Sequence, residues 1–126
     1  MRASPPQSRD MDLIRDILLW MERGMPMETR PIREDGGLPK YAYHCYLLAD
    51  AGFIEAKIHN NIDGMPHRVF PIKITWKGQE ALEAMRNDTV WNKTKETLAE
   101  RGLPYLLDVV VSVAKGYAVQ YGIPVA

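Results

Sequence analysis

Two short runs of sequence decide the fold: Phe53-Ile54-Glu55-Ala56-Lys57-Ile58-His59 and Arg68-Val69-Phe70-Pro71-Ile72-Lys73-Ile74. Apolar and polar residues alternate in each run, which is the period of a half-buried strand. In the second run Phe70, Ile72 and Ile74 share one face, and Pro71 restricts the strand to a sheet edge or a bulge. Segment 60–66, rich in turn-forming Asn, Asp and Gly, separates the two runs. The sequence therefore predicts a β-hairpin.

Immediately before the hairpin, residues 39–51 have the pattern of a helix. Pro39 suits the first turn of a helix, and Gly52 suits its end. A stripe at helical spacing should face the core: Tyr41, Cys45 and Leu48. His44 lies beside this stripe, so we expect it to be a hydrogen-bonded core histidine.

Further helices flank this centre. Apolar residues recur at three- and four-residue steps over 10–23, and a connector with a short extended piece follows over 25–37. After the hairpin, Thr75 and Asn87 are suitable N-caps for helices ending at Arg86 and Arg101. Residues 105–121 are apolar on several faces, and their length favours a helix over a strand.

The order helix, short extended piece, helix, hairpin and further helices predicts a mostly helical α+β fold, a winged helix with a β-hairpin wing and a C-terminal helical extension. We divide the chain into a flexible leader at 1–8, a winged-helix domain at 9–86, and C-terminal helices at 87–126 that pack on the core or form a dimer contact. We expect Trp20, Trp76 and Trp91 to pack these added helices against the core.

Composition restricts the functional class. The chain has 126 residues, enough for one modest core, with 16 Lys and Arg against 16 Asp and Glu. With a formal charge of zero, any basic surface must be local. The single cysteine, Cys45, cannot form an internal disulfide, which favours a reducing, cytoplasmic compartment. No apolar run reaches membrane-spanning length, so we expect no membrane association.

The sequence resembles a family of short bacterial and prophage proteins known only as a domain of unknown function, and more distantly the YjcQ family. Five segments carry the resemblance: Arg9–Leu19, Tyr43-His44, Leu47–Ile54, Ile74–Leu82 and Arg86–Lys95. The resemblance implies a winged-helix fold and frequent residence in phage or prophage genes. It implies no catalytic residues.

In a DNA-binding winged helix, the helix before the wing enters the major groove and the wing touches the backbone. The contact residues predicted on this basis are Lys40, Tyr43, Tyr46, Lys57, Asn60, Asn61, His67 and Arg68. Double-stranded DNA is the first expected partner. A host protein is the alternative, because exposed tyrosines and zero net charge also suit a protein interface.

The last helix has an apolar face that can pack on the core or form a homodimer, and we expect the homodimer. The residues of this face are Leu106, Val109, Val110, Val113 and Tyr117. A dimer would double the small positive charge near the hairpin. His59 and His67 bracket the hairpin, but a structural zinc site needs four ligands, so no metal is predicted. The sequence contains no phosphate-binding glycine loop and no nucleophile with its base, so we expect a non-catalytic protein without a cofactor.

Overall fold

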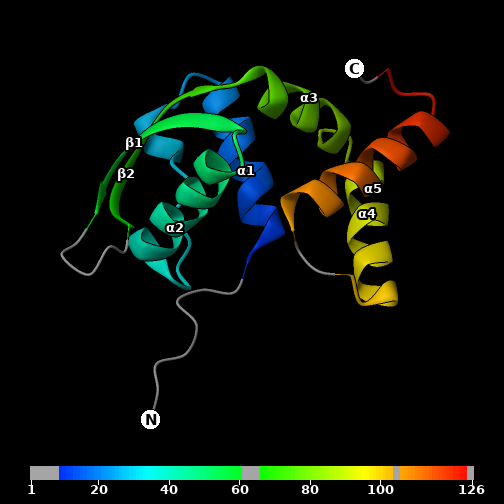
Figure 1. Cartoon of the computed structure of the whole chain (residues 1–126), viewed down its shortest axis with the longest axis horizontal. Helices are drawn as coiled ribbons and strands as arrows, with labels where there is room; N and C mark the ends of the chain where they lie inside the picture. Colours follow the sequence, from blue (N-terminus) through cyan, green and yellow to red (C-terminus); the bar gives the residue numbers. More distant parts are fainter. Residues whose placement is uncertain (1–8, 61–65, 104–105, 125–126) are drawn as a thin grey trace, which may run out of the picture. The chain divides into compact units, whose positions relative to one another are not determined.

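The computed structural model describes residues 9–60, 66–103 and 106–124 (Figure 1). Within these ranges the chain forms five α-helices, one 3-10 helix and a two-stranded antiparallel sheet: α1 (Met11–Glu22), η1 (Met27–Thr29), α2 (Gly37–Asp50), β1 (Ile54–Asn60), β2 (Pro66–Ile74), α3 (Trp76–Met85), α4 (Asp88–Arg101) and α5 (Leu107–Gln120). The predicted mostly helical α+β class and the hairpin are confirmed. The expected extended piece in the connector is instead the 3-10 turn η1.

The chain divides into two compact units, and the boundary along the sequence lies between Thr75 and Trp76. We call residues up to Thr75 unit 1 and residues from Trp76 onward unit 2. The sequence had placed a boundary after residue 86. In the structure α3 contacts α4 and α5, so it belongs with the C-terminal helices. The leader at 1–8 lies outside the described residues.

Unit 1 is built on α1, whose N-cap Asp10 accepts a hydrogen bond from the Leu13 N–H at 3.0 Å. One face of this helix is fully buried, and α1 contacts both α2 and β2. The predicted inner stripe of α2 is confirmed, because its three members are at most 3% exposed: Tyr41, Cys45 and Leu48. Burying side chains of this size contributes about 1.5 to 3 kcal/mol each.

The hairpin has an irregular register. Glu55 pairs with Lys73 and Ala56 with Pro71, so Ile72 is an extra residue in β2. A bulge is one of the two alternatives, sheet edge or bulge, that the sequence leaves open for Pro71. Val69 is buried, whereas Phe70 and Ile72 are 47% and 53% exposed. The shared apolar face that the alternation predicts in β2 is therefore largely exposed.

Unit 2 is a set of three helices. Asn87 caps α4 by accepting from the Val90 N–H, and Gly102 ends α4 with a left-handed φ of 62°. The helix α5 buries a seam of small residues spaced four apart: Val110, Ala114 and Ala118. Trp20 and Trp91 are buried, whereas Trp76 is 78% exposed, so the predicted packing role of Trp76 is wrong. Trp76 can face solvent because other residues of α3 form the buried face of this helix.

The helices of the described ranges are all too short, or too polar, to cross a bilayer.

Candidate functional site

The irregular connector after α1 forms one wall of the candidate site. Met25 adopts a left-handed φ of 58°, which is uncommon for a residue with a Cβ. The indole N–H of Trp20 donates to the Pro26 carbonyl at 2.8 Å and anchors the start of the connector. Backbone strain of this kind collects at functional segments and requires a supporting structure. Here the support is the buried C-terminal half of α1.

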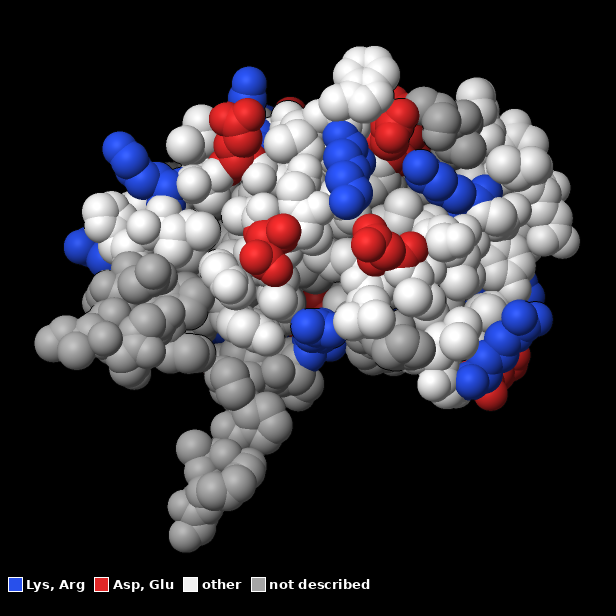
Figure 2. Space-filling model, viewed as in Figure 1, with Lys and Arg blue, Asp and Glu red and all other residues white. Residues whose placement is uncertain are grey.

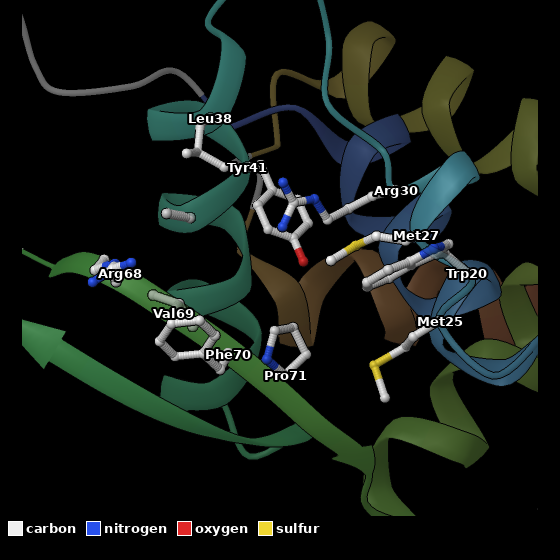
Figure 3. Close-up of a pocket in the computed structure, with 11 residues that line it drawn as sticks. Trp20, Met25, Met27, Arg30, Leu38, Tyr41, Arg68, Val69, Phe70 and Pro71 are labelled. Atoms are coloured by element: carbon white, nitrogen blue, oxygen red, sulfur yellow. The ribbon is translucent and has the colours of Figure 1, made fainter.

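Between this connector, α2 and β2 lies a groove of about 410 Å³ (Figure 3). It is lined by Trp20, Met25, Met27, Arg30, Leu38, Tyr41, Ala42, Arg68, Val69, Phe70 and Pro71. Met27 is 72% exposed and Leu38 is 53% exposed, so the rim is apolar and accessible. The volume is within the range of ligand sites. All of these residues belong to unit 1.

Two arginines lie at the groove. The Arg30 guanidinium is 5.4 Å from the centre of the Tyr41 ring, and the Arg68 guanidinium is 5.8 Å from the centre of the Phe70 ring. In Figure 3 Arg68 lies on β2 at one end of the lining, and the Arg30 guanidinium lies over the Tyr41 ring. Within the described ranges neither arginine forms an ion pair with a carboxylate. The groove thus combines an apolar floor with two cations that a ligand can neutralise.

Lys40 was predicted to point outward to a partner, and this orientation is wrong. It is only 9% exposed, and its Nζ lies 3.0 Å from an oxygen of Asp10 and 3.0 Å from an oxygen of Asp35. A Cβ on Gly36, the N-cap of α2, would lie 2.6 Å from the Lys40 Cβ, so glycine leaves room for the lysine stem. The lysine therefore joins the start of α1 to the start of α2.

The charged groups around Lys40 stabilise one another. The hydrogen bonds to Asp35 and Asp10 raise the pKa of Lys40. Burial by itself would raise the pKa of Asp10, but the Leu13 N–H and the Lys40 ammonium hold it below its usual value. Nearby, Arg33 forms an ion pair with Asp16 at 2.9 Å. These contacts hold the helices together and leave the cation of Lys40 already neutralised.

His44 is the hydrogen-bonded core histidine that the sequence predicts. Its Nε2 accepts from the Asp10 N–H at 2.8 Å, and its Nδ1 is 2.8 Å from the Lys40 carbonyl. Since Nε2 is an acceptor, Nδ1 carries the proton and the ring is neutral. Burial lowers the pKa of His44, which favours the same state. With both nitrogens occupied, His44 has no free lone pair to act as a base.

The cysteine beside the groove is not chemically activated. Burial raises the pKa of the Cys45 thiol to about 12, and it also raises the pKa of the neighbouring Tyr41. Only the thiolate is a strong nucleophile, so Cys45 is a packing residue at neutral pH. Within the described part of the chain, no cluster of His, Cys, Asp and Glu side chains has the arrangement of a metal site.

The other predicted contact residues are scattered over unit 1. Lys57 and Arg68 are exposed on the hairpin, and Tyr43 and Tyr46 are half-buried on α2. His59 pairs with Arg68 across the strands, not with His67. Asn61 lies outside the described residues, and for Asn60 and His67 only the backbone in β1 and β2 is described. The groove brings together one of the predicted contacts, Arg68, with residues that the sequence did not indicate.

Lys and Arg side chains do not form a continuous band on the face shown in Figure 2, where acidic side chains stand among them. On the hairpin itself Lys73 lies 3.7 Å from Glu55. A duplex-binding surface normally needs several phosphate contacts. Lys57 and Arg68 are the exposed cations that the described hairpin offers without a carboxylate partner among the described residues.

The predicted face of α5 is divided between burial and exposure. Val110 is buried, and three others are half-buried: Val109, Val113 and Tyr117. The Tyr117 hydroxyl lies 2.6 Å from the Thr97 hydroxyl of α4, so α5 packs within unit 2. Leu106 is 46% exposed. Val110 is thus a buried residue of unit 2, and the dimer stays a prediction.

Comparison with known proteins identifies the family. The profile of a family described as "Hypothetical protein (DUF2513)" matches residues 8–104, which include the whole of the groove. The chain belongs to the DUF2513 family. An uncharacterized protein of Haemophilus influenzae is 37% identical over 112 residues, which cover 85% of this chain and 92% of the relative. No solved structure matches this DUF2513 protein.

Sequence reasoning missed most of the groove of this DUF2513 protein. Met25, Met27 and Arg30 come from a connector without a helical or strand period. The available signal was the cluster of methionines and prolines between two glycine-bounded helices, which marks an irregular but apolar segment.

Proposed function

We propose that unit 1 is a shortened winged helix, in which the connector replaces the usual first strand and middle helix. We also propose that it works by binding a protein. The protein would be a non-catalytic, cytoplasmic module of bacterial or prophage origin, such as a regulator or inhibitor of a host protein. The carrying observation is the accessible apolar groove with Arg30 and Arg68 at its sides.

Two further observations favour a protein over a duplex. Lys40, the one lysine of α2, forms ion pairs with Asp10 and Asp35. The surface of α2 therefore offers tyrosine and leucine side chains to a partner, and not a free lysine. Exposed Met27, Leu38 and Phe70 lose their contact with water when a partner covers them. A DNA backbone would instead place charged phosphate groups against these apolar side chains, which gains nothing from their burial. The groove thus combines accessible apolar side chains with two arginines.

The test is capture of a partner from nuclease-treated bacterial lysate, with wild type and Leu38→Glu compared. Leu38 lies in the first turn of α2 and is half exposed, and an acidic residue near a helix N-terminus is stabilising, so the variant should fold. Val119→Glu is the matched control, because Val119 is 67% exposed on α5 of unit 2. We expect a protein retained by wild type and Val119→Glu and lost by Leu38→Glu. Equal recovery with all three proteins would overturn the proposal.

Double-stranded DNA is the second candidate, favoured by the exposed cations Lys57 and Arg68 on the hairpin. The test is a mobility shift of random-sequence duplex at several salt concentrations. If DNA is the partner, the combined change Lys57→Glu and Arg68→Glu removes a shift that weakens steeply with salt. A wild-type protein that never shifts the duplex excludes this candidate.

Dimerisation through α5 is a separate proposal, which would place two copies of the hairpin in one assembly. Leu106 and the half-buried valines of α5 support it. Light scattering from micromolar to near-millimolar protein should show twice the chain mass. A monomer mass throughout this range would contradict it.

A further inference from the structure

We infer that the groove binds an extended peptide segment carrying a bulky apolar side chain flanked by carboxylates, and that this segment pairs with the outer edge of β2. The inference rests on the proposed protein-binding function and states the chemistry of the partner. Its three supports are the open strand edge, the apolar lining and the two arginines.

The first support is the edge of β2. The sheet has two strands, and within the described residues no backbone hydrogen bond joins β2 to a segment other than β1. Val69, Phe70 and Pro71 line the groove, so the strand runs along one of its sides (Figure 3). An unpaired edge beside a groove is the arrangement in which a partner adds a strand. Pro71 has no N–H, which directs the pairing to the preceding residues.

The second support is the lining of the groove. Met25 and Met27 come from the connector, and Leu38 lies opposite them on α2. Unbranched methionine side chains adapt to the shape of an apolar partner. The cavity of about 410 Å³ can receive large side chains from an extended segment, which presents them alternately to one side. A bulky apolar residue is therefore the expected anchor.

The third support is charge. Arg30 and Arg68 come from the connector and from β2, each lies against an aromatic ring, and neither is paired with a carboxylate of the described chain. A guanidinium offers parallel N–H donors that match a carboxylate, and this pairing is stronger than a neutral hydrogen bond. Two such groups around one apolar pocket select acidic residues on both sides of the anchor. A basic peptide would be repelled.

The experiment is selection from a displayed library of random twelve-residue peptides on the full-length protein. We expect the enriched peptides to share an aromatic or large aliphatic residue with Asp or Glu on each side. Leu38→Glu should weaken their binding at least tenfold, and Val119→Glu should leave it unchanged. N-methylation of the peptide backbone next to the anchor should weaken binding as well, because it removes the donors that pair with β2.

Charge-reversal variants test the predicted role of the two arginines in the same peptide selection. Arg30→Glu combined with Arg68→Glu should lose the acidic peptides and gain versions in which Lys replaces Asp and Glu, whereas Arg23→Glu, an exposed site at the end of α1, should not. The inference is overturned if no peptide is enriched, if enriched peptides lack acidic residues, or if they bind Leu38→Glu equally well. If the peptide inference fails in this way, a lysate protein that is lost only by Leu38→Glu would still support the protein-binding function. Failure of the peptide inference can therefore be told apart from failure of the proposed function.

Discussion

The two compact units differ in the surroundings of their buried alanines. In unit 2, Ala114 lies in the fully buried seam of α5, where small residues allow close approach of the neighbouring helices. In unit 1, Ala42 is also buried, but it borders the groove. Apolar side chains are exposed in both units, but in unit 1 several of them, with Ala42, line a groove, and Lys40 joins the starts of α1 and α2. This groove is the reason for proposing the binding surface in unit 1.

The largest effect should come from breaking the charged contacts of unit 1. Lys40→Glu places a third acid beside Asp10 and Asp35 and should lower the free energy of unfolding by about 2 to 4 kcal/mol. Chemical denaturation of the variant measures this change. Arg68→Glu, exposed on the hairpin, is the control and should leave stability nearly unchanged. An unchanged stability of Lys40→Glu would show that the pairs do not hold unit 1 together.

A matched pair of alanine substitutions sharpens the comparison between the units. Ala114→Leu forces extra volume into a closed seam and should destabilise by about 1 to 3 kcal/mol. Ala42→Leu extends toward the groove and should cost less than about 1 kcal/mol, because space is available. Thermal unfolding of both variants checks the order. Equal losses would mean that the groove is not open at Ala42.

Acid should weaken unit 1 through His44. The folded-state pKa of His44 lies below its ordinary value, so the unfolded chain takes up the proton first as pH falls through about 6.5. Stability is therefore fully present above that pH and declines below it, by at most about 1.4 kcal/mol per pH unit. Asp10 and Asp35, with lowered pKa values, add a separate loss in more acidic solution. Denaturation at about pH 7 and about pH 5 measures the slope.

The control for this slope is His44→Gln, which should be less stable at neutral pH but nearly independent of pH over the same interval. His59→Gln, on the exposed face of β1, should retain the wild-type slope. A His44→Gln protein with an unchanged slope would assign the pH dependence to another group.

The smallest effect is expected at Trp76. Its indole is 78% exposed and donates to Glu80 within α3 at 3.1 Å. Trp76→Ala should change the free energy of unfolding by no more than about 0.5 kcal/mol, as for other surface substitutions. A loss of several kcal/mol would restore the packing role that the sequence suggested.

The periodic parts of the sequence predicted the structure well. Apolar spacing located α1, α2 and the strands to within a few residues, and β2 has a bulge beside Pro71, which the sequence restricts to a sheet edge or a bulge. Periodicity failed where a long-range pair decides the position of a side chain. Lys40 is polar and lies beside the apolar stripe, so the helical pattern places it outside, but Asp10 from α1 draws it inward. No local rule contains that contact.

The groove was beyond prediction for a related reason. Alternation identifies which residues of β2 share a face, but not which face is covered, and the bulge at Ile72 changes the alternation. The connector has no period at all, so the meeting of Met27 with Leu38 and Phe70 depends on the tertiary fold. Arg68 is the exception, because a cation on a hairpin is a recognisable signal, and its role as a contact residue stays a prediction.

Photo-crosslinking in cells tests the central claim most directly, with a photoreactive amino acid at Leu38 in the groove or at Val119 in unit 2. The account predicts that the Leu38 position, and not the Val119 position, yields an adduct with a protein other than a second copy of this chain, and that this adduct persists after nuclease treatment. Adducts with nucleic acid, or protein adducts from Val119 alone, would contradict it.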